Sequence, residues 1–393
     1  VLRFPAVASK KFLITIGDRT VSGLVFRDQF IGNKQVPVSD YAATLDQLDT
    51  YSGQVFSIGE KPSIAISNPE ASTRMAMAEA ITNVCGVVHD SIEKLTFSAN
   101  WMSSTKSSDE KGDLVRGVES VVNLSEDLGV SIPVGKDSLS MKTRWQDDSE
   151  KEVTSPMTLN ISVFSNVMDL RESVTPELSN DETTLLHLWI NENDFRMGGS
   201  CLYQSYGLYG GETPDLEKPK QLKRLFNSTQ KLLKQHKICA LHDISDGGLI
   251  TSLLEMSLCS GQGLSINLNL SDKSKIIPKL FSEEIGLVVE VPNKHLKGVK
   301  DYYQEKDIYC EEIAKKSVEK TFKLINFNEE IFSVDINTLF KSWDSMSHQV
   351  QSERDSKTCA SEEQDNFVNF DYFITPEILS LIHISEPTRL CRI

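Results

Sequence analysis

The chain has 393 residues, of which 41 are basic and 56 acidic, and its formal net charge is −15 at pH 7. Such a chain lacks the excess of Lys and Arg that binds nucleic acid or anionic membranes, so neither partner is expected. It has no apolar run near the roughly 20 residues that cross a bilayer, so no membrane span is predicted. Its seven cysteines include no C-x-x-C pair, which indicates reduced thiols, a cytoplasmic protein and no zinc site.

The first part of the chain predicts strands alternating with helices. Strands are expected at Lys11–Ile16, 24–30, Lys94–Ala99, Ser131–Val134 and Thr158–Phe164. Helices are expected at Ala71–Gly86 and Asp113–Leu128, and the second has apolar residues spaced as on one helix face. The sequence GKDS (135–138) is expected to be a polar turn. The alternation indicates α/β or α+β layering.

The second part restarts the same alternation after a polar, proline-containing stretch near Leu170. Strands are expected at Leu185–Ile190, 263–270 and 283–291, and helices at Leu222–Gln235 and Leu249–Cys259. From Met346 to Asp365 the sequence is polar and poor in apolar residues, which is typical of a linker.

These patterns predict a two-domain chain, in line with its length. The first domain is expected at 1–170 and the second at 171–345, followed by a polar linker at 346–379. Residues 380–393 (SLIHISEPTRLCRI) resemble a translated library adaptor, so a non-native tail is expected, with an ordinary disordered terminus as the alternative. The chain begins at Val1 rather than Met, so it is expected to lie inside a longer polypeptide.

Two oxygen-bearing side chains stand out on the helix Ala71–Gly86, which is otherwise apolar or small. Glu79 and Asn83 are four residues apart and therefore lie on one face. A buried carboxylate needs a partner, because an unpaired buried charge is costly. The partner is either a metal ion or an internal cation such as Arg74 or a lysine elsewhere, and the helix alone favours neither.

Two further carboxylates follow apolar runs that are expected to be strands. Asp40 comes after QVPVS, and Asp243 lies in HDISDGGL directly after the run ending in Leu241. Mg²⁺ prefers oxygen ligands and commonly bridges protein carboxylates to nucleotide phosphates. The candidate metal ligands are therefore Asp40, Glu79, Asn83 and Asp243. Spacing alone does not place them together.

Small residues beside these aspartates suit a nucleotide. Ser39 and Ser245 are candidates for contact with phosphate through a hydroxyl or a backbone N–H. Gly247 and Gly248 let the backbone approach a ligand closely before the next helix, and Asp246 is expected to cap that helix.

Other glycine-bounded loops give weaker signals. GDRTVSG (17–23) with Arg19, GKDS with Lys136 and GGS (198–200) each read as a phosphate-binding loop or as a plain polar turn. None has the spacing of a Walker loop.

Nine motifs in order resemble one family. They are GDRTVSGLVFRDQFIG, QVPVSDYAATL, AMAEAITN, KLTFSANWM, IPVGKDSLSMKTRWQ, SPMTLNISVF, MGGSCLYQ, LHDISDGGL and FSEEIGLVVEV. Together they resemble phosphoribosylformylglycinamidine synthase of the large, single-chain type, from about Arg3 to Asp365. The resemblance implies an aminoimidazole-ribonucleotide-synthetase-like fold, with an N-terminal domain that pairs with a sister domain into a barrel, followed by a C-terminal α/β domain.

The resemblance also implies an activity. The family converts formylglycinamide ribonucleotide to its amidine in purine biosynthesis, using ATP and glutamine-derived ammonia. This chain would be the second of two synthetase halves, and the first half and the glutaminase domain would lie outside it. In large enzymes of this kind the second half retains ADP as a structural ligand, so the isolated fragment is expected to be inactive.

By motif match, the resemblance makes the four candidate ligands Mg²⁺ ligands and makes Ser39 and Ser245 nucleotide contacts. Ser39 departs from the alanine expected there in many relatives, although a backbone contact would survive that change. The alternatives are a nucleotide-binding scaffold without catalysis of its own and another ATP-dependent enzyme of the same fold.

Overall fold

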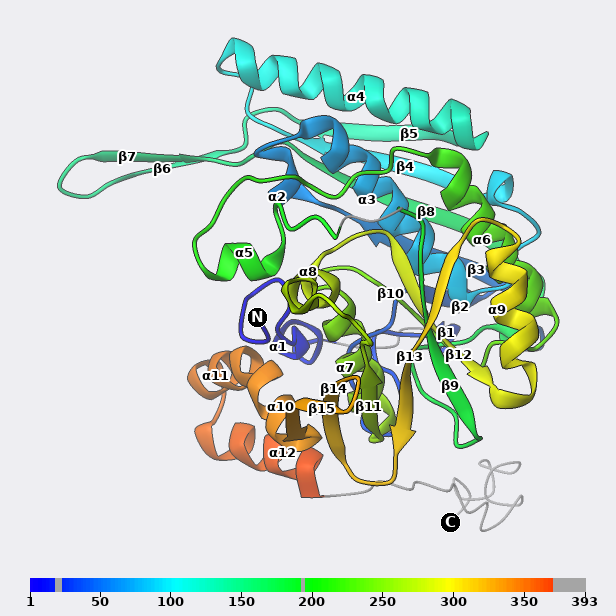
Figure 1. The fold of residues 1–393 in the computed structure, drawn as a ribbon. Helices are drawn as coiled ribbons and strands as arrows, with labels where there is room; N and C mark the ends of the chain where they lie inside the picture. The colour runs from blue at the N-terminus through cyan, green and yellow to red at the C-terminus, as the bar shows by residue number, and fades with distance from the viewer. Residues whose placement is uncertain (18–22, 192–194, 370–393) are drawn as a thin grey trace, which may run out of the picture.

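In the computed structural model, which describes residues 1–17, 23–191 and 195–369, two α/β domains pack against each other (Figure 1). The N-terminal domain contains a six-stranded sheet with the strand order β1-β2-β3-β8-β4-β5. Its strands are β1 (Val25–Arg27), β2 (Ala42–Leu45), β3 (Gly53–Gly59), β4 (Thr96–Met102), β5 (Ser131–Ser138) and β8 (Thr158–Val167). Neighbouring strands are antiparallel except β4 and β5, which are parallel.

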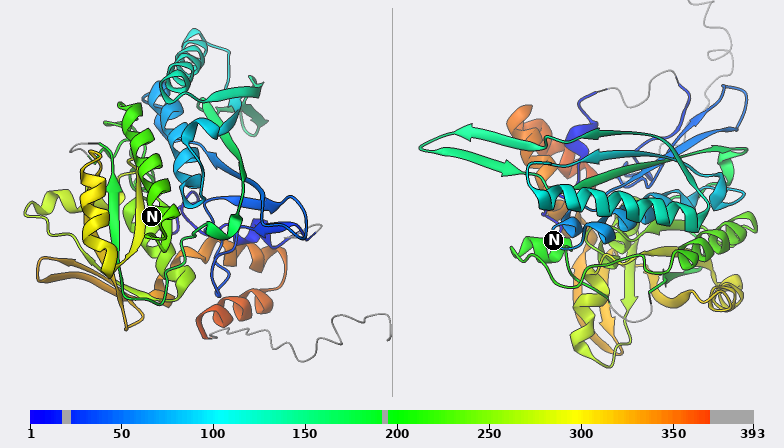
Figure 2. Two further views of the ribbon diagram at one scale, coloured as in Figure 1. Left: turned by 90° about the vertical axis from the view of Figure 1, so that its right-hand side faces the viewer. Right: turned by 90° about the horizontal axis from the view of Figure 1, so that it is seen from above.

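Helices cover one face of this sheet. The long helix α3 (Pro69–Asn83) packs on β3 and β8, and α4 (Ser108–Leu128) packs on α3. The side chain of Asn68 caps α3 by accepting the N–H of Ala71. Figure 2 shows α3 lying between the sheet and the C-terminal domain. The shorter helical pieces are α1 (Lys11–Ile14), α2 (Pro62–Ala65), η1 (Val84–Gly86), η2 (Ile92–Lys94) and η3 (Leu170–Glu172).

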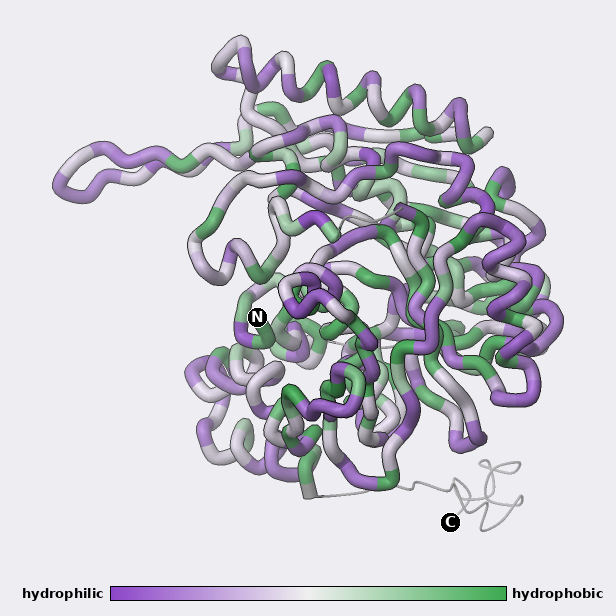
Figure 3. The backbone as a smooth tube through the Cα atoms, viewed as in Figure 1, coloured by the Kyte–Doolittle hydropathy of each residue, from purple (hydrophilic) through white to green (hydrophobic). Residues whose placement is uncertain are grey.

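The opposite face of the sheet is open. Phe56 of β3 and Phe164 of β8 are cross-strand partners on this face, with ring centroids 6.2 Å apart and exposed fractions of 41% and 46%. Strand β3 alternates strictly between buried and exposed residues, as a sheet with one covered face requires. Between β5 and β8 in the chain, β6 (Lys142–Gln146) and β7 (Glu150–Thr154) form a hairpin that projects from the domain and is mostly hydrophilic (Figure 3).

The C-terminal domain contains a seven-stranded sheet with the order β10-β12-β9-β13-β11-β14-β15. Its strands are β9 (Thr183–Trp189), β10 (Ala240–Asp243), β11 (Gly263–Asn267), β12 (Gly286–Pro292), β13 (Tyr309–Ser317), β14 (Thr321–Asn326) and β15 (Glu329–Asp335). The helices that accompany them are α5 (Cys201–Ser205), α6 (Pro219–Lys234), α7 (Leu249–Ser260), η4 (Lys273–Lys275), α8 (Ile276–Phe281), η5 (Asn293–His295), α9 (Leu296–Gln304) and α10 (Ile336–Trp343). Within the described residues, every helix is too short or too polar to cross a membrane.

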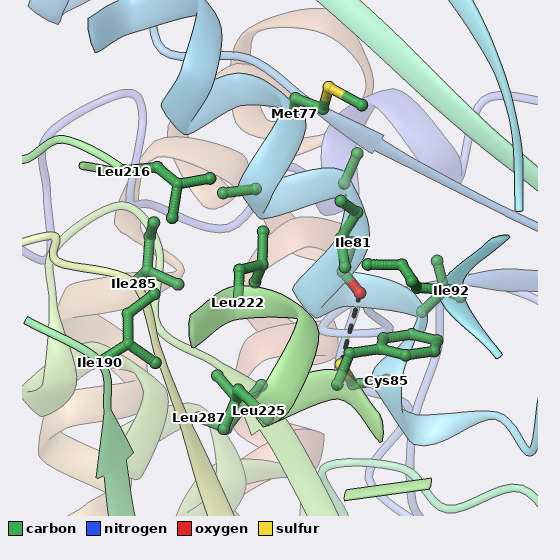
Figure 4. Packing of buried hydrophobic residues seen from close by; sticks show 14 of the residues in the cluster. Met77, Ile81, Cys85, Ile92, Ile190, Leu216, Leu222, Leu225, Ile285 and Leu287 are labelled. Atoms are coloured by element: carbon green, nitrogen blue, oxygen red, sulfur yellow. Dashed lines mark hydrogen bonds between the residues drawn. The ribbon is translucent and has the colours of Figure 1, made fainter. Parts of the chain in front are cut away.

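The two domains share one hydrophobic core. A single cluster of buried residues joins side chains of α3 with side chains of α6 and the C-terminal sheet. Figure 4 shows Met77 and Ile81 of α3 gathered with Leu222 and Leu225 of α6. Burial of apolar surface stabilises by about 25 cal/mol per Å², so this contact binds the domains strongly together.

A second core cluster lies on the other face of the C-terminal sheet. It contains residues of α7 and α10 and also Val7, Ile31, Val36 and Val38 from the start of the chain. The first residues of the chain therefore pack with the C-terminal domain, although the sequence places them in a domain spanning 1–170.

Two local predictions are wrong. Lys11–Ile16, predicted as a strand, begins with the helix α1, which lies against α11 (Ser345–Arg354). GKDS, predicted as a turn, is the end of β5, where Lys136 pairs with Asn100 of β4. In a short apolar run such as Lys11–Ile16, the period alone does not distinguish a helix from a strand. In both segments, contacts with residues distant in the sequence decide the local structure.

The predicted polar linker is also wrong over its described part. Apart from the link at 355–356, residues 346–369 lie in the helices α11 and α12 (Lys357–Asn369), which pack on each other. Ion pairs tie the start of the chain to these helices, since Lys11 Nζ lies 3.2 Å from Glu363 Oε1. Arg354 donates to the carbonyl of Phe12 at 2.7 Å. These contacts hold the polar segment against the start of the chain.

Candidate functional site

A pocket of about 430 Å³ lies where the two domains meet, at the end of β10. Five of the six residues predicted as ligand contacts line it, namely Ser39, Asp40, Asn83, Asp243 and Ser245. The sixth, Glu79, contacts Ser245 directly. Residues that are up to about two hundred positions apart in the sequence thus converge on one cleft, as the metal-site hypothesis requires. A larger cavity of about 650 Å³ near Asn68 and Arg196 contains none of the six.

His242 links the carboxylates of the pocket. Its Nδ1 lies 2.7 Å from Asp40 Oδ1 and 3.6 Å from Asp243 Oδ1, as ion-pair contacts rather than aligned hydrogen bonds. Its Nε2 lies 3.0 Å from Glu255 Oε2 on α7. Burial alone would lower the pKa of His242, but Asp40 and Glu255 raise it well above its ordinary value. The imidazolium therefore orients these carboxylates.

Asp243 is the residue best placed to hold a cation. It is buried, and its Oδ2 has no hydrogen-bond partner among the described residues. Burial and the nearby charge of Asp40 raise the pKa of Asp243 well above its usual range. Ligand atoms of Asp40, His242 and Asp243 lie within 4.8 Å of one another. An orphaned buried oxygen beside a second carboxylate fits a hard divalent ion, which would relieve the repulsion between them.

Glu79 has an internal cationic partner, which was one of the two possibilities that the sequence of its helix left open. Its Oε1 lies 3.1 Å from the ammonium of Lys61 and accepts a short hydrogen bond from Ser245 Oγ. Its Oε2 accepts the backbone N–H of Glu60 at 2.8 Å. Burial raises the pKa of Glu79, and Lys61 opposes that rise. Arg74, the other candidate partner, instead binds Asp215 through two hydrogen bonds.

The remaining predicted residues are held by local backbone contacts. Ser39 Oγ donates to the carbonyl of Tyr41 at 2.7 Å, which leaves its lone pairs as acceptors. Asn83 Nδ2 donates to the carbonyl of Ile58 at 2.9 Å, so its amide oxygen stays available as a ligand.

The turn after β10 depends on its glycines. Gly247 and Gly248 have φ angles of 87° and 74°, and a Cβ on Gly248 would lie 2.6 Å from the carbonyl oxygen of Ser282. The N–H of Gly247 donates to buried Glu283 at 2.8 Å. Asp246 does not cap α7, contrary to the prediction, because its carboxylate binds Lys61 at 2.7 Å.

Sequence reasoning missed three residues of the site. Lys61 lies in the short polar sequence GEKP, with no motif around it. Glu255 is the one charged residue of a mostly apolar helix, and Glu283 begins a strand-like run. Burial raises the pKa of Glu283 to about 7, with Asp246 adding to the rise. The only signal that marks them is a charged residue at the edge of an apolar run, for Lys61 and Glu283, or inside one, for Glu255. Arg19 of the predicted GDRTVSG loop lies outside the described residues.

Two family models match most of the described chain. One, described as an FGAR-AT PurM_N-like domain, matches residues 9–166. The other, described as the C-terminal domain of AIR synthase related proteins, matches residues 188–325. The matches follow one another along the chain, one in each domain of the structure.

Solved structures with the same fold support this assignment. PurL of T. maritima complexed with FGAR has a TM-score of 0.62 and 12% identity, over 85% of this chain and 50% of that chain. The same protein complexed with ADP has a TM-score of 0.59 and 12% identity, over 85% and 49%. A chain of the HypE–HypF complex has a TM-score of 0.50 and 18% identity, over 75% and 92%.

This chain spans about half the length of the PurL chains that it matches. Identities this low show a common fold and no more. The predicted α/β fold of the aminoimidazole-ribonucleotide-synthetase type is thereby confirmed. The chain therefore contains an FGAR-AT PurM_N-like domain followed by an AIR synthase related C-terminal domain.

Proposed function

We propose that this chain is the second synthetase half of a phosphoribosylformylglycinamidine synthase and that its interdomain pocket binds a magnesium–nucleotide complex. The observation that carries the proposal is the convergence of Asp40, Asn83 and Asp243 on one pocket, with the Asp243 Oδ2 lacking a partner in the described structure. PurL of T. maritima has been solved with ATP and with ADP, which supports a nucleotide as the ligand.

Each residue has a defined role in this proposal. Asp40, Glu79, Asn83 and Asp243 hold Mg²⁺, while Ser39 and Ser245 contact the nucleotide. Bound Mg²⁺ would neutralise phosphate charge and fix the position of the diphosphate. His242 keeps Asp40 and Asp243 oriented through its Nδ1. A Cβ on Gly247 would meet the side chain of Thr251, and one on Gly248 would meet the backbone of 280–282, so the two glycines let the turn after β10 pack closely.

The rest of the enzyme would lie outside this chain. The reaction proposed for the whole protein joins glutamine-derived ammonia to formylglycinamide ribonucleotide at the expense of ATP, in the cytoplasm. PurL has been solved with FGAR, and a PurLQS structure from Thermotoga maritima is also among the matches. The open face of the N-terminal sheet is the surface that suits the first synthetase half, because it exposes aromatic side chains next to the pocket.

Binding and turnover of nucleotide by the chain together test the proposal. We expect Mg-ADP to raise the melting temperature of the chain and Mg-ATP to bind without being hydrolysed at enzymatic rates. Calorimetric titration and a phosphate-release assay measure the two properties. Absence of binding would contradict the proposed site. Rapid hydrolysis would favour an ATP-dependent enzyme of the same fold, to which the likeness to the HypE–HypF complex also points.

The open sheet face gives a second expectation. Without the first half, the chain should self-associate through this face, because a contiguous apolar patch in water favours burial. Phe164→Glu places a charge at the centre of the patch and should shift the chain to the monomer in sedimentation analysis. Tyr209→Glu is the matched control, since Tyr209 is also an exposed aromatic residue but lies outside the sheet. A Phe164→Glu variant that associates like the wild type would contradict the expectation.

A further inference from the structure

Lys61 is a buried lysine at the junction of the two domains, and the proposed function gives it no role. It precedes α2, and 3% of its side chain is exposed. Its ammonium lies 2.7 Å from Asp246 Oδ1, 3.0 Å from Ser245 Oγ and 3.1 Å from Glu79 Oε1. It therefore contacts two of the proposed ligand residues, one from each domain.

The charges around Lys61 explain why it is there. Glu79, Asp246 and Glu283 all surround this ammonium. A carboxylate taken out of water without a counter-charge is strongly destabilising, and only 13% of the Glu79 side chain is exposed. Lys61 supplies that counter-charge when no metal ion is bound.

Glu79 differs in this respect from Asp243. Both oxygens of Glu79 are occupied, Oε1 by Lys61 and Ser245, and Oε2 by the N–H of Glu60. Asp243 keeps a buried oxygen that no described residue contacts through a hydrogen bond. Of the two carboxylates, Asp243 is thus ready for a metal ion, and Glu79 is already neutralised by a protein cation.

We propose that Lys61 is the resident counter-cation of the site and competes with the divalent ion for Glu79. The inference rests on the proposed function, because it takes Glu79 to be a metal ligand. Lys61 holds Glu79 and Ser245 in place while the site is empty, and its positive charge opposes the arrival of a second cation. Lys61 is a positioning residue that stabilises the metal-free protein at the expense of metal affinity.

The Lys61→Met variant tests the proposal in the whole chain, with Mg²⁺ alone as the probe. In chelator, the variant should melt several degrees below the wild type, because Glu79 and Asp246 lose their counter-charge. Its Mg²⁺ affinity, measured by calorimetry and by the melting shift, should rise about tenfold. The Lys61→Arg variant keeps the charge and should restore both values. A purely structural lysine would give lower stability with unchanged or weaker Mg²⁺ binding, and that result would overturn the proposal.

Lys10→Met is the matched control. Lys10 is a partly buried lysine near Asp246 and Glu255, but its ammonium donates to the backbone carbonyls of Ala6 and Ala8. Its removal changes the nearby charge by the same amount and should alter Mg²⁺ affinity much less than Lys61→Met. An equal effect of the two variants would show general electrostatics instead of competition for Glu79, and would overturn the proposal.

A second variant covers the case in which Lys61→Met does not fold. Asp246 is 42% exposed, so Asp246→Asn should fold. The substitution removes the other carboxylate that contacts the Lys61 ammonium, so the ammonium pairs with Glu79 alone. Because Glu79 is then held more firmly by Lys61, Mg²⁺ affinity should fall severalfold. Unchanged or tighter binding would contradict the competition. Mg-ADP binding by the wild type tests the proposed function separately. If the wild type binds Mg-ADP but the Lys61 and Asp246 variants have unchanged Mg²⁺ affinity, only this inference is refuted.

Discussion

Replacing Asp243 with asparagine is expected to remove most of the melting shift that Mg-ADP gives the wild-type chain. The variant loses the carboxylate oxygen that has no hydrogen-bond partner in the described structure. We expect the dissociation constant to rise about a hundredfold, or about 2.8 kcal/mol. At a ligand concentration of 100 times the wild-type constant, the stabilisation would fall from about 2.7 to about 0.4 kcal/mol. Thermal unfolding with and without Mg-ADP measures this difference.

The same variant should keep its stability without ligand. Asp243 is buried beside Asp40, so a neutral asparagine relieves repulsion. Glu79→Gln should also weaken binding, but it should lower stability without ligand because Lys61 loses a counter-charge. Asp90→Asn, at an exposed position away from the pocket, is the control. An Asp243→Asn chain with the full Mg-ADP shift would refute the assigned metal role.

Truncation of Phe226 to alanine is expected to cost about 3–5 kcal/mol of the free energy of unfolding. The ring is fully buried on α6 in the core that both domains share, and it stacks on His89 of the N-terminal domain at 5.9 Å. Loss of the ring leaves a cavity between the domains and so destabilises both. Urea unfolding followed by tryptophan fluorescence and by circular dichroism should show one transition, shifted equally in both signals.

The control for this variant is Ile277→Ala, an exposed apolar residue on α8, which should change stability by roughly 0.5 kcal/mol or less. Two separated transitions in Phe226→Ala, with only one of them shifted, would contradict a shared core. Such a result would mean that the domains unfold independently.

Much of the site could be predicted because its residues interrupt apolar runs. Asp40 and Asp243 follow apolar runs, and Glu79 and Asn83 interrupt a helix that is otherwise suited to burial. Polar residues at such positions need a partner, and the structure brings Asp40, Asn83 and Asp243 to one pocket, with Glu79 beside it in contact with Ser245. Lys61 could not be predicted, since its contacts Ser245 and Asp246 are about 180 positions away in the sequence. A single lysine in a loop is ordinarily solvated.

The errors in the fold have the same origin. The apolar run Lys11–Ile16 has no period of its own, and its helix forms against α11, where Ser347 Oγ accepts the N–H of Phe12. The segment 346–369 has too few apolar residues to predict a helix, yet it folds on the start of the chain. In both cases contacts between the two ends of the described chain determine the local structure.

The shared core has a kinetic consequence for anything held in the pocket. Asp40 and Asn83 belong to one domain and Asp243 and Ser245 to the other, and the buried layer of α3 and α6 fastens the two walls together. A hinge motion that widened the cleft would have to separate α3 from α6 and expose this core to water. Exchange of a bound molecule therefore runs through the existing mouth of the pocket and does not wait for the domains to separate.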